Sequence, residues 1–150
     1  MHDVVVIALG SPLLVGVYHE GALVERFETP QQSSDALPAI FAALLPRYTI
    51  RNLIYAKGPG SFMGIKVAYI FLKTLSIVKG YGFYAADAFF FNQNRPIKAI
   101  GKLCFVKTLE SIETRQFDDV PPSSFLLPAN ISMDDFDSDT LPFYGISAVG

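Results

Sequence analysis

The sequence is poor in the residues that build disulfide bonds, metal centres and membrane spans. Among 150 residues it has one cysteine, Cys104, and two histidines, His2 and His19. One cysteine excludes an internal disulfide bond and fits a reducing cytosol, and neither histidine lies in a metal-ligating cluster. Every apolar run is interrupted before membrane-spanning length, and the start, Met1-His2-Asp3, lacks the basic region of a signal peptide. We therefore expect a cytoplasmic protein with no metal site and no membrane contact.

Charged residues are few, and their two signs are separated along the chain. They make up 17% of the residues, and the net charge of −2 argues against a protein that binds nucleic acid by itself. Ten basic residues and one acid, Asp87, lie within residues 47–107, whereas eight acids and one base, Arg115, lie within residues 108–150. An ordinary solvated surface explains this pattern. The alternative is a basic face that meets an acidic partner or an RNA backbone.

Apolar runs and turn signals predict a mixed α/β fold. Strands are expected at residues 4–9, 13–18 and 22–27, with Glu20-Gly21 as a hairpin turn. A helix capped by Asp35, with Pro38 in its first turn, should end near residue 45. A strand at 53–56, a helix at 61–80 and a strand at 83–86 follow, so that these two strands are parallel neighbours. This order fits half of an actin-like ATPase fold, which is ribonuclease H-like.

The pattern weakens beyond residue 86. Residues 87–91 suggest a short helix, residues 97–106 and 109–117 suggest two strands, and residues 118–124 form a proline-rich polar linker before an acidic tail. We therefore expect a ribonuclease H-like N-terminal lobe over residues 1–86 and a reduced second lobe over residues 87–150.

A glycine-rich loop joins the strand predicted at 53–56 to the helix that follows. Its sequence is Lys57-Gly58-Pro59-Gly60-Ser61-Phe62-Met63-Gly64. A loop between a strand and a helix suits an anion. However, Met63 stands where the dinucleotide fingerprint has glycine, and Ile65 separates the last glycine from Lys66, unlike in the P-loop. From spacing alone, a tight turn in which Ser61 caps the helix is the more frequent outcome.

The stretch Tyr55-Ala56-Lys57-Gly58-Pro59-Gly60-Ser61-Phe62-Met63-Gly64-Ile65-Lys66 resembles the GRGPGSFTGVR signature of the TsaB (YeaZ) family. That family is the non-catalytic partner of TsaD in making N6-threonylcarbamoyladenosine at position 37 of bacterial tRNAs. The rest of the chain is similar only in layout. The resemblance implies the actin-like fold and a motif loop formed by Gly58, Pro59, Gly60, Ser61, Phe62 and Gly64.

The resemblance also implies which partners and cofactors to expect. A TsaD-like protein should pair with this chain and hold the ATP and the metal, so that this chain needs no cofactor of its own. A TsaE-like ATPase is a further expected partner, and tRNA should be contacted only through the complex.

Three positions depart from the family pattern and argue against chemistry by this chain. Its Ile7-Ala8-Leu9 lacks the aspartate of the family's Ile-Asp-Thr, Gly101 stands where a second aspartate is usual, and Gln32 replaces a histidine. In related ATPases, a carboxylate at the position of Ala8 helps to organise metal and phosphate. We therefore expect no catalytic residue.

Two predicted helices are more apolar than helices that expose one side to water. Residues 36–45 contain no charge, and residues 65–78 contain only Lys66 and Lys73. Such helices must bury a second face against the chain's own C-terminal part or, as the short polar remainder favours, against another protein. In the TsaB family these helices contact TsaD and also form a competing homodimer. The predicted interface is Phe41, Leu45, Met63, Lys66, Val67, Ile70, Lys73 and Ile77, with Ile65, Ala68, Leu72 and Leu75 facing the sheet.

Three functional hypotheses follow. The first is a scaffold that activates TsaD. The second is a small actin-like-fold enzyme, a kinase or acyltransferase, that binds nucleotide at residues 58–64, and the missing aspartates weigh against it. The third is a self-associating structural module, which stays open because one surface can serve a homodimer and a heterodimer.

Overall fold

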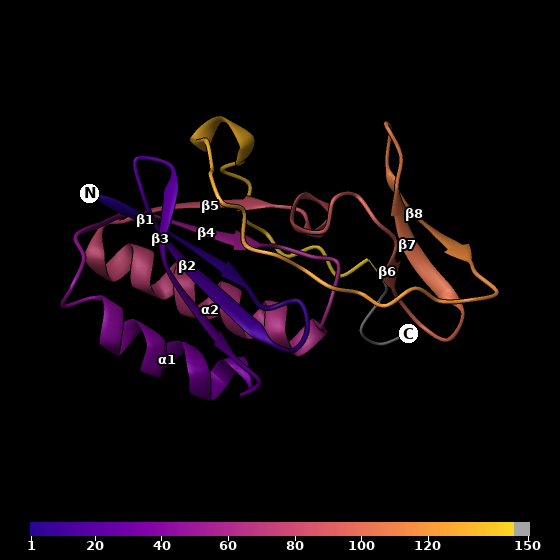
Figure 1. Cartoon of the computed structure of the whole chain (residues 1–150), viewed down its shortest axis with the longest axis horizontal. Helices are drawn as coiled ribbons and strands as arrows, with labels where there is room; N and C mark the ends of the chain where they lie inside the picture. Colours follow the sequence, from indigo (N-terminus) through magenta and orange to yellow (C-terminus); the bar gives the residue numbers. More distant parts are fainter. Residues whose placement is uncertain (146–150) are drawn as a thin grey trace.

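Two β-sheets organise the protein, whose computed structural model describes residues 1–145. The larger sheet has five strands in the order β3-β2-β1-β4-β5, and the smaller has three in the order β6-β7-β8. Two helices cover one face of the larger sheet, and the smaller sheet lies beyond the far end of that layer (Figure 1). Within residues 1–145, no helix has both the length and the apolarity that crossing a membrane requires.

The larger sheet begins with the predicted hairpin meander. It is formed by β1 (His2–Ile7), β2 (Leu13–His19) and β3 (Ala22–Thr29), which pair antiparallel. Glu20 and Gly21 have φ values of 49° and 84°, as a two-residue hairpin turn of the primed type requires. β4 (Ile50–Ala56) lies parallel to β1, and β5 (Gly82–Ala86) lies parallel to β4, as the crossover helices predict.

The helix α1 (Ser33–Leu44) begins earlier than predicted. Gln32 occupies the N-cap without a side-chain bond, so the prediction that Asp35 caps the helix is wrong. Asp35 lies in the first turn, where its charge still favours the positive end of the helix dipole. Pro38 consequently lies in the second turn, and the carbonyl of Ser34 loses the N–H that would otherwise bond to it.

The helix α2 (Phe62–Lys79) has the predicted ends. The Oγ of Ser61 accepts a hydrogen bond from the backbone N–H of Gly64 at 3.2 Å. Gly80 ends the helix in the left-handed conformation, with φ of 75°, and its N–H donates to the carbonyl of Ser76.

The second sheet is more interrupted than the sequence suggests. After the short 3₁₀ helix η1 (Ala88–Phe91), it consists of β6 (Ile97–Lys98), β7 (Leu103–Lys107) and β8 (Ile112–Gln116), all antiparallel. The single strand predicted at 97–106 is therefore wrong. Gly101, at φ of 57°, allows the chain to reverse there, and the N–H of Leu103 donates to the carbonyl of Ile100.

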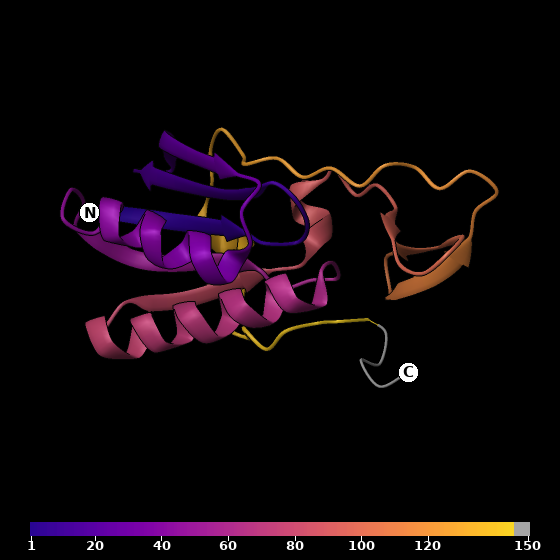
Figure 2. The ribbon, with the colours of Figure 1, turned by 90° about the horizontal axis from the view of Figure 1, so that it is seen from below.

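The C-terminal segment returns to the larger sheet, although we expected residues 87–150 to form a second lobe. The N–H of Leu23 donates to the carbonyl of Ala129 at the β3 edge, and Ala85 exchanges two backbone hydrogen bonds with Asp137 at the β5 edge. Between these edges, the segment and its 3₁₀ helix η2 (Met133–Asp135) cross the face opposite the helices (Figure 2). We call residues 125–144 the tail strap; residues 146–150 of the expected lobe lie outside the described part.

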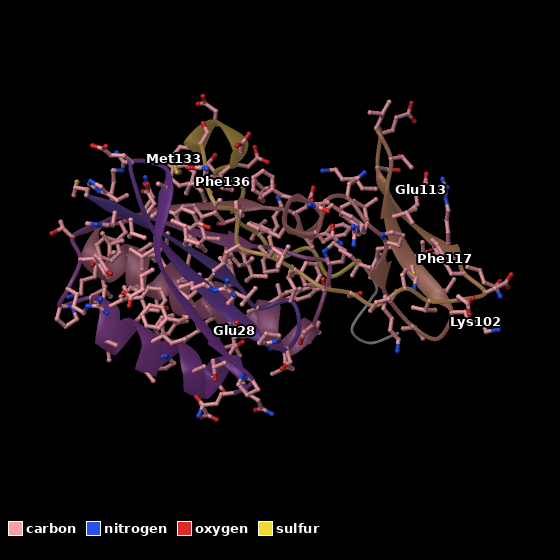
Figure 3. The ribbon with its side chains drawn as sticks, in the orientation of Figure 1. Glu28, Lys102, Glu113, Phe117, Met133 and Phe136 are labelled. Carbon is pink, nitrogen blue, oxygen red and sulfur yellow. The ribbon has the colours of Figure 1, made fainter. Side chains whose placement is uncertain are left out.

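The tail strap completes the core. Met133 is half-buried and Phe136 is buried against the larger sheet, and Figure 3 labels both beside it. The hydroxyl of Tyr18 donates to the carbonyl of Pro128 at 2.7 Å, and that of Tyr55 donates to the carbonyl of Thr140. Burial raises the pKa of both phenols, so both stay neutral donors. Both faces of β1 are consequently buried, one by helices and one by the tail strap.

We expect Tyr18→Phe to lower the free energy of unfolding by about 1–2 kcal/mol, because the Pro128 carbonyl loses its buried donor while the ring stays in place. Urea denaturation followed by circular dichroism measures this change. An unchanged unfolding midpoint would show that the strap is not held through this hydroxyl.

Candidate functional site

The glycine-rich loop between β4 and α2 is bonded to the ends of β1 and β5, the strands on either side of β4. The N–H of Ser61 donates to the carbonyl of Leu9, just after β1, at 2.8 Å. The N–H of Lys57 donates to the carbonyl of Ala86 at the end of β5, and the carbonyl of Gly58 accepts from the N–H of Ala88. These bonds hold the loop against its own sheet and leave its backbone less free to surround an anion.

Close backbone contacts explain the three loop glycines. A Cβ on Gly60 would lie 2.9 Å from the carbonyl oxygen of Leu9, and one on Gly64 would overlap the carbonyl oxygen of Ala8. Gly58 has φ of 117°, and a Cβ there would overlap the carbonyl oxygen of Phe143 in the tail strap. The loop signature is therefore accounted for by packing between β1, α2 and the tail strap.

A groove beside the loop gathers two of the three positions that depart from the family pattern. Ala8, Gln32 and Ser61 line it together with Gly10, Ser11, Leu13, Pro30, Gln31, Ser33, Ser34, Met63, Gly64 and Val67. None of these described residues is charged, so the groove offers neither a carboxylate for a metal nor a cation for a phosphate. Gly101 does not line this groove, because it lies in the turn between β6 and β7.

The two sides of α2 divide as the sequence predicts. Ile65, Ala68 and Leu72 are buried against the sheet, and Leu75 is half-buried. On the other side, Met63, Ile70 and Ile77 are 60%, 53% and 71% exposed, and Lys66 and Lys73 are exposed beside them. We call Met63, Lys66, Ile70, Lys73 and Ile77 the outer stripe of α2.

The prediction that Phe41 and Leu45 form the exposed face of α1 is wrong, because the opposite side of the helix faces solvent. Phe41 is only 2% exposed, and its ring lies 5.3 Å from the ring of Phe71 of α2, so it cannot offer its surface to a partner. Leu45, just beyond the helix, is half-buried against the core. The exposed side of α1 instead carries small residues: Pro38, Ala39, Ala42 and Ala43. Their spacing of one and four residues is the signal that could have identified this face.

An apolar groove lies between the two helices. It has a volume of about 480 Å³ and is lined by Ser34, Val67, Ile70, Phe71, Thr74, Leu75 and Val78. Val67 and Ile70 were predicted interface residues, whereas Phe71, Thr74 and Val78 were not. The groove itself is uncharged and lies beside the outer stripe of α2, whose Lys66 and Lys73 are the nearby charges, so it suits a protein side chain better than a polar ligand.

The protein matches no known family model and no curated protein in sequence. It does match solved structures. YeaZ from Pseudomonas aeruginosa is 14% identical with a TM-score of 0.60, over 82% of this chain and 71% of that chain. An uncharacterized protein with similarity to peptidase YEAZ from Pseudomonas aeruginosa is 15% identical with a TM-score of 0.57, over 85% of this chain and 69% of that chain. These matches confirm the predicted actin-like, ribonuclease H-like fold, and the names of both proteins contain YeaZ, the family to which the loop signature points.

We expect Gly64→Ala to cost about 1–3 kcal/mol of folding free energy, because the added methyl group meets the carbonyl of Ala8. In an unhindered helix the same change would instead stabilise by about 0.5–1 kcal/mol. The matched control is Gly10→Ala, where the new Cβ has nothing within 4 Å. Thermal unfolding of both variants decides the point, and equal melting temperatures would remove the packing explanation of the loop.

Proposed function

We propose that this protein is a non-catalytic subunit that pairs with a TsaD-like protein in the threonylcarbamoylation of adenosine 37 of tRNA. The exposed apolar surface of α1 and α2 carries this proposal. The resemblance of the loop to the TsaB signature and the fold shared with YeaZ support it. A TsaE-like ATPase is a further partner of such a complex, and tRNA meets this chain only within it.

The apolar surface supplies the docking energy. Ile70 and Ile77 are more than half exposed, although both are large apolar side chains on one side of the same helix, two turns apart. Burying such side chains gives about 25 cal/mol per Å² of apolar surface. The small residues on the outer side of α1 allow a partner helix to approach closely. Lys66 and Lys73 alternate with the apolar residues of the outer stripe, so acidic residues on the partner would fix its orientation.

The proposed mechanism is a population shift in the partner. Docking on α1 and α2 favours the active arrangement of the TsaD-like protein only if this chain binds that arrangement more tightly than the inactive one. The partner then holds the nucleotide and the metal. The uncharged groove near Ser61 supports this division of roles, because it offers no group that would neutralise a phosphate. Exposed basic residues within 47–107 add a weak, salt-sensitive contact to tRNA.

The same apolar surface favours self-association as a second function of this face. A homodimer through α1 and α2 would compete with the heterodimer, since both need the outer stripe of α2. The enzyme hypothesis is weaker, because the loop glycines are occupied by contacts within the chain.

Reconstituted modification of tRNA tests the proposal. With tRNA, a donor of the threonylcarbamoyl group, a TsaD-like protein and a TsaE-like ATPase present, we expect product only when this chain is added. Calorimetry with Mg-ATP should give no binding to the isolated chain. Equal product without the chain, at concentrations where the complex forms, would refute the role. ATP turnover by the chain alone would favour the enzyme instead.

We expect Ile70→Asp to weaken binding to the TsaD-like protein by about 2 kcal/mol or more, because the carboxylate would lie unpaired in a desolvated contact. The fold should remain stable, since Ile70 is already 53% exposed. Leu109→Asp is the matched control, because Leu109 is exposed in the turn between β7 and β8, far along the chain from α2. Calorimetric titration of both variants checks this, and equal weakening by both would show that the outer stripe is not the contact.

A further inference from the structure

The outermost strand of the second sheet has an open edge. Within residues 1–145, β8 pairs only with β7, and it lies on the side of the small sheet that faces away from the larger one (Figure 1). Glu113, Thr114, Arg115 and Gln116 are exposed, and Ile112 is half-buried. Open edges invite pairing with a further strand unless proline, a bulge or a cover blocks them. β8 contains no proline, and its pairing with β7 has no bulge.

The backbone bonds at both ends of β8 show which groups are available. The carbonyl of Ser111 accepts from the N–H of Thr108, and the N–H of Phe117 donates to the carbonyl of Lys102, so residues 111 and 117 direct their backbone groups toward β7. Backbone direction alternates along an antiparallel edge strand. Ile112, Thr114 and Gln116 therefore direct their N–H and carbonyl groups away from β7.

Two opposite charges lie on β8, one on each side of Thr114. Glu113 and Arg115 flank it and share one face of the sheet, where they form an ion pair of 3.2 Å. Both side chains are about half exposed, at 47% and 60%. When the strand is reversed about Thr114, the two charges exchange places. An antiparallel copy of β8 is thus complementary to β8 itself.

We propose that β8 is a self-association edge, to which the β8 of a second copy of this chain adds antiparallel with Thr114 opposite Thr114. In this register, the outward N–H and carbonyl groups of Thr114 bond to those of Thr114 in the second copy. The outward groups of Ile112 in each copy bond to those of Gln116 in the other. Glu113 of one copy then lies opposite Arg115 of the other, as a non-hydrogen-bonded pair with Cα atoms only about 4.5 Å apart. Opposite charges meet at this close position in both halves of a two-fold dimer.

Neighbouring registers are worse either for the charges or for the backbone. A centre on Glu113 or Arg115 would still pair outward backbone groups, but it would bring like charges together. A centre between two residues would set an outward-facing residue opposite an inward-facing one and break the ladder of hydrogen bonds. This dependence on register is why a second copy, rather than an arbitrary extended peptide, is the occupant that fits. The dimer leaves the outer stripe of α2 open, because that stripe lies on the other sheet's helices. Two copies of a helix-binding partner can therefore attach to one dimer.

Sedimentation velocity over low to high micromolar concentrations tests the proposal, with circular dichroism to confirm that each variant folds. The wild-type chain should show a concentration-dependent dimer. Thr114→Pro removes an outward N–H without touching the bonds to β7. In an Ile70→Asp background, which removes association through the helix face, it should abolish the dimer. Glu113→Arg should raise the dissociation constant about tenfold by placing like charges opposite each other. The double variant Glu113→Arg/Arg115→Glu restores the symmetry and should return the constant to about the wild-type value.

Two controls separate this edge from the other surfaces. On the edge strand β3, Glu28 forms a similar ion pair with Arg26 at 3.1 Å, and Glu28 is labelled in Figure 3. Glu28→Arg breaks this pair and should leave the dimer unchanged. Ile70→Asp on the helix face removes any homodimer through α1 and α2 and should leave the β8 dimer in place. A chain that stays monomeric, a charge-swapped variant that fails to recover, or a dimer lost with either control would overturn the proposal. The proposed pairing with a TsaD-like protein is unaffected by any of these outcomes, since loss of the dimer with Ile70→Asp would only assign self-association to the helix face.

Discussion

The close contact between the end of β1 and the start of α2 determines much of what this protein exposes. The N–H of Ser61 bonds to the carbonyl of Leu9, and Gly60 and Gly64 lie where no side chain could fit. This contact fixes both the distance of α2 from the sheet and its rotation. With the rotation fixed, Ile65 and Leu72 face the sheet while Ile70 is left in solvent. A loop that looks like a ligand cradle thus acts first as a packing element that orients a helix.

The tail strap covers the face of the larger sheet that the helices leave open. A five-stranded sheet with buried residues on both sides of β1 needs a second layer, and here an irregular segment provides it. The strap is held by backbone bonds at both sheet edges and by the hydroxyls of Tyr18 and Tyr55 in between. Its carboxylates Asp134 and Asp135 are exposed next to buried Phe136, so acidic and core residues alternate within a few positions. The strap also touches the loop, since the N–H of Phe143 donates to the carbonyl of Lys57.

The proposed functions use surfaces that the core does not need. The outer stripe of α2 is largely apolar, with two lysines, and belongs to the larger sheet's helices, whereas β8 is polar and belongs to the small sheet. Helix docking would depend on apolar burial, which tolerates some adjustment of the partner. Edge pairing would depend on backbone register and charge order, which tolerate very little. The two kinds of contact can therefore serve different partners at the same time.

The sequence by itself determined the order of strands and helices in the first 86 residues, because apolar periodicity, Ser61, Gly80 and the Glu20-Gly21 turn are local signals. It also determined which side of α2 is buried, since two lysines seven residues apart mark the outer side. It could not fix the rotation of α1, whose small and apolar residues provide no such mark, and Phe41 was therefore misplaced. The tail strap was equally inaccessible, because its course depends on hydrogen bonds to residues about a hundred positions away, such as Tyr18 to Pro128. Only the tertiary structure brings such distant groups together. It alone therefore decided which face of α1 is exposed and how the second face of the sheet is covered. It also decided that the loop glycines are needed for packing.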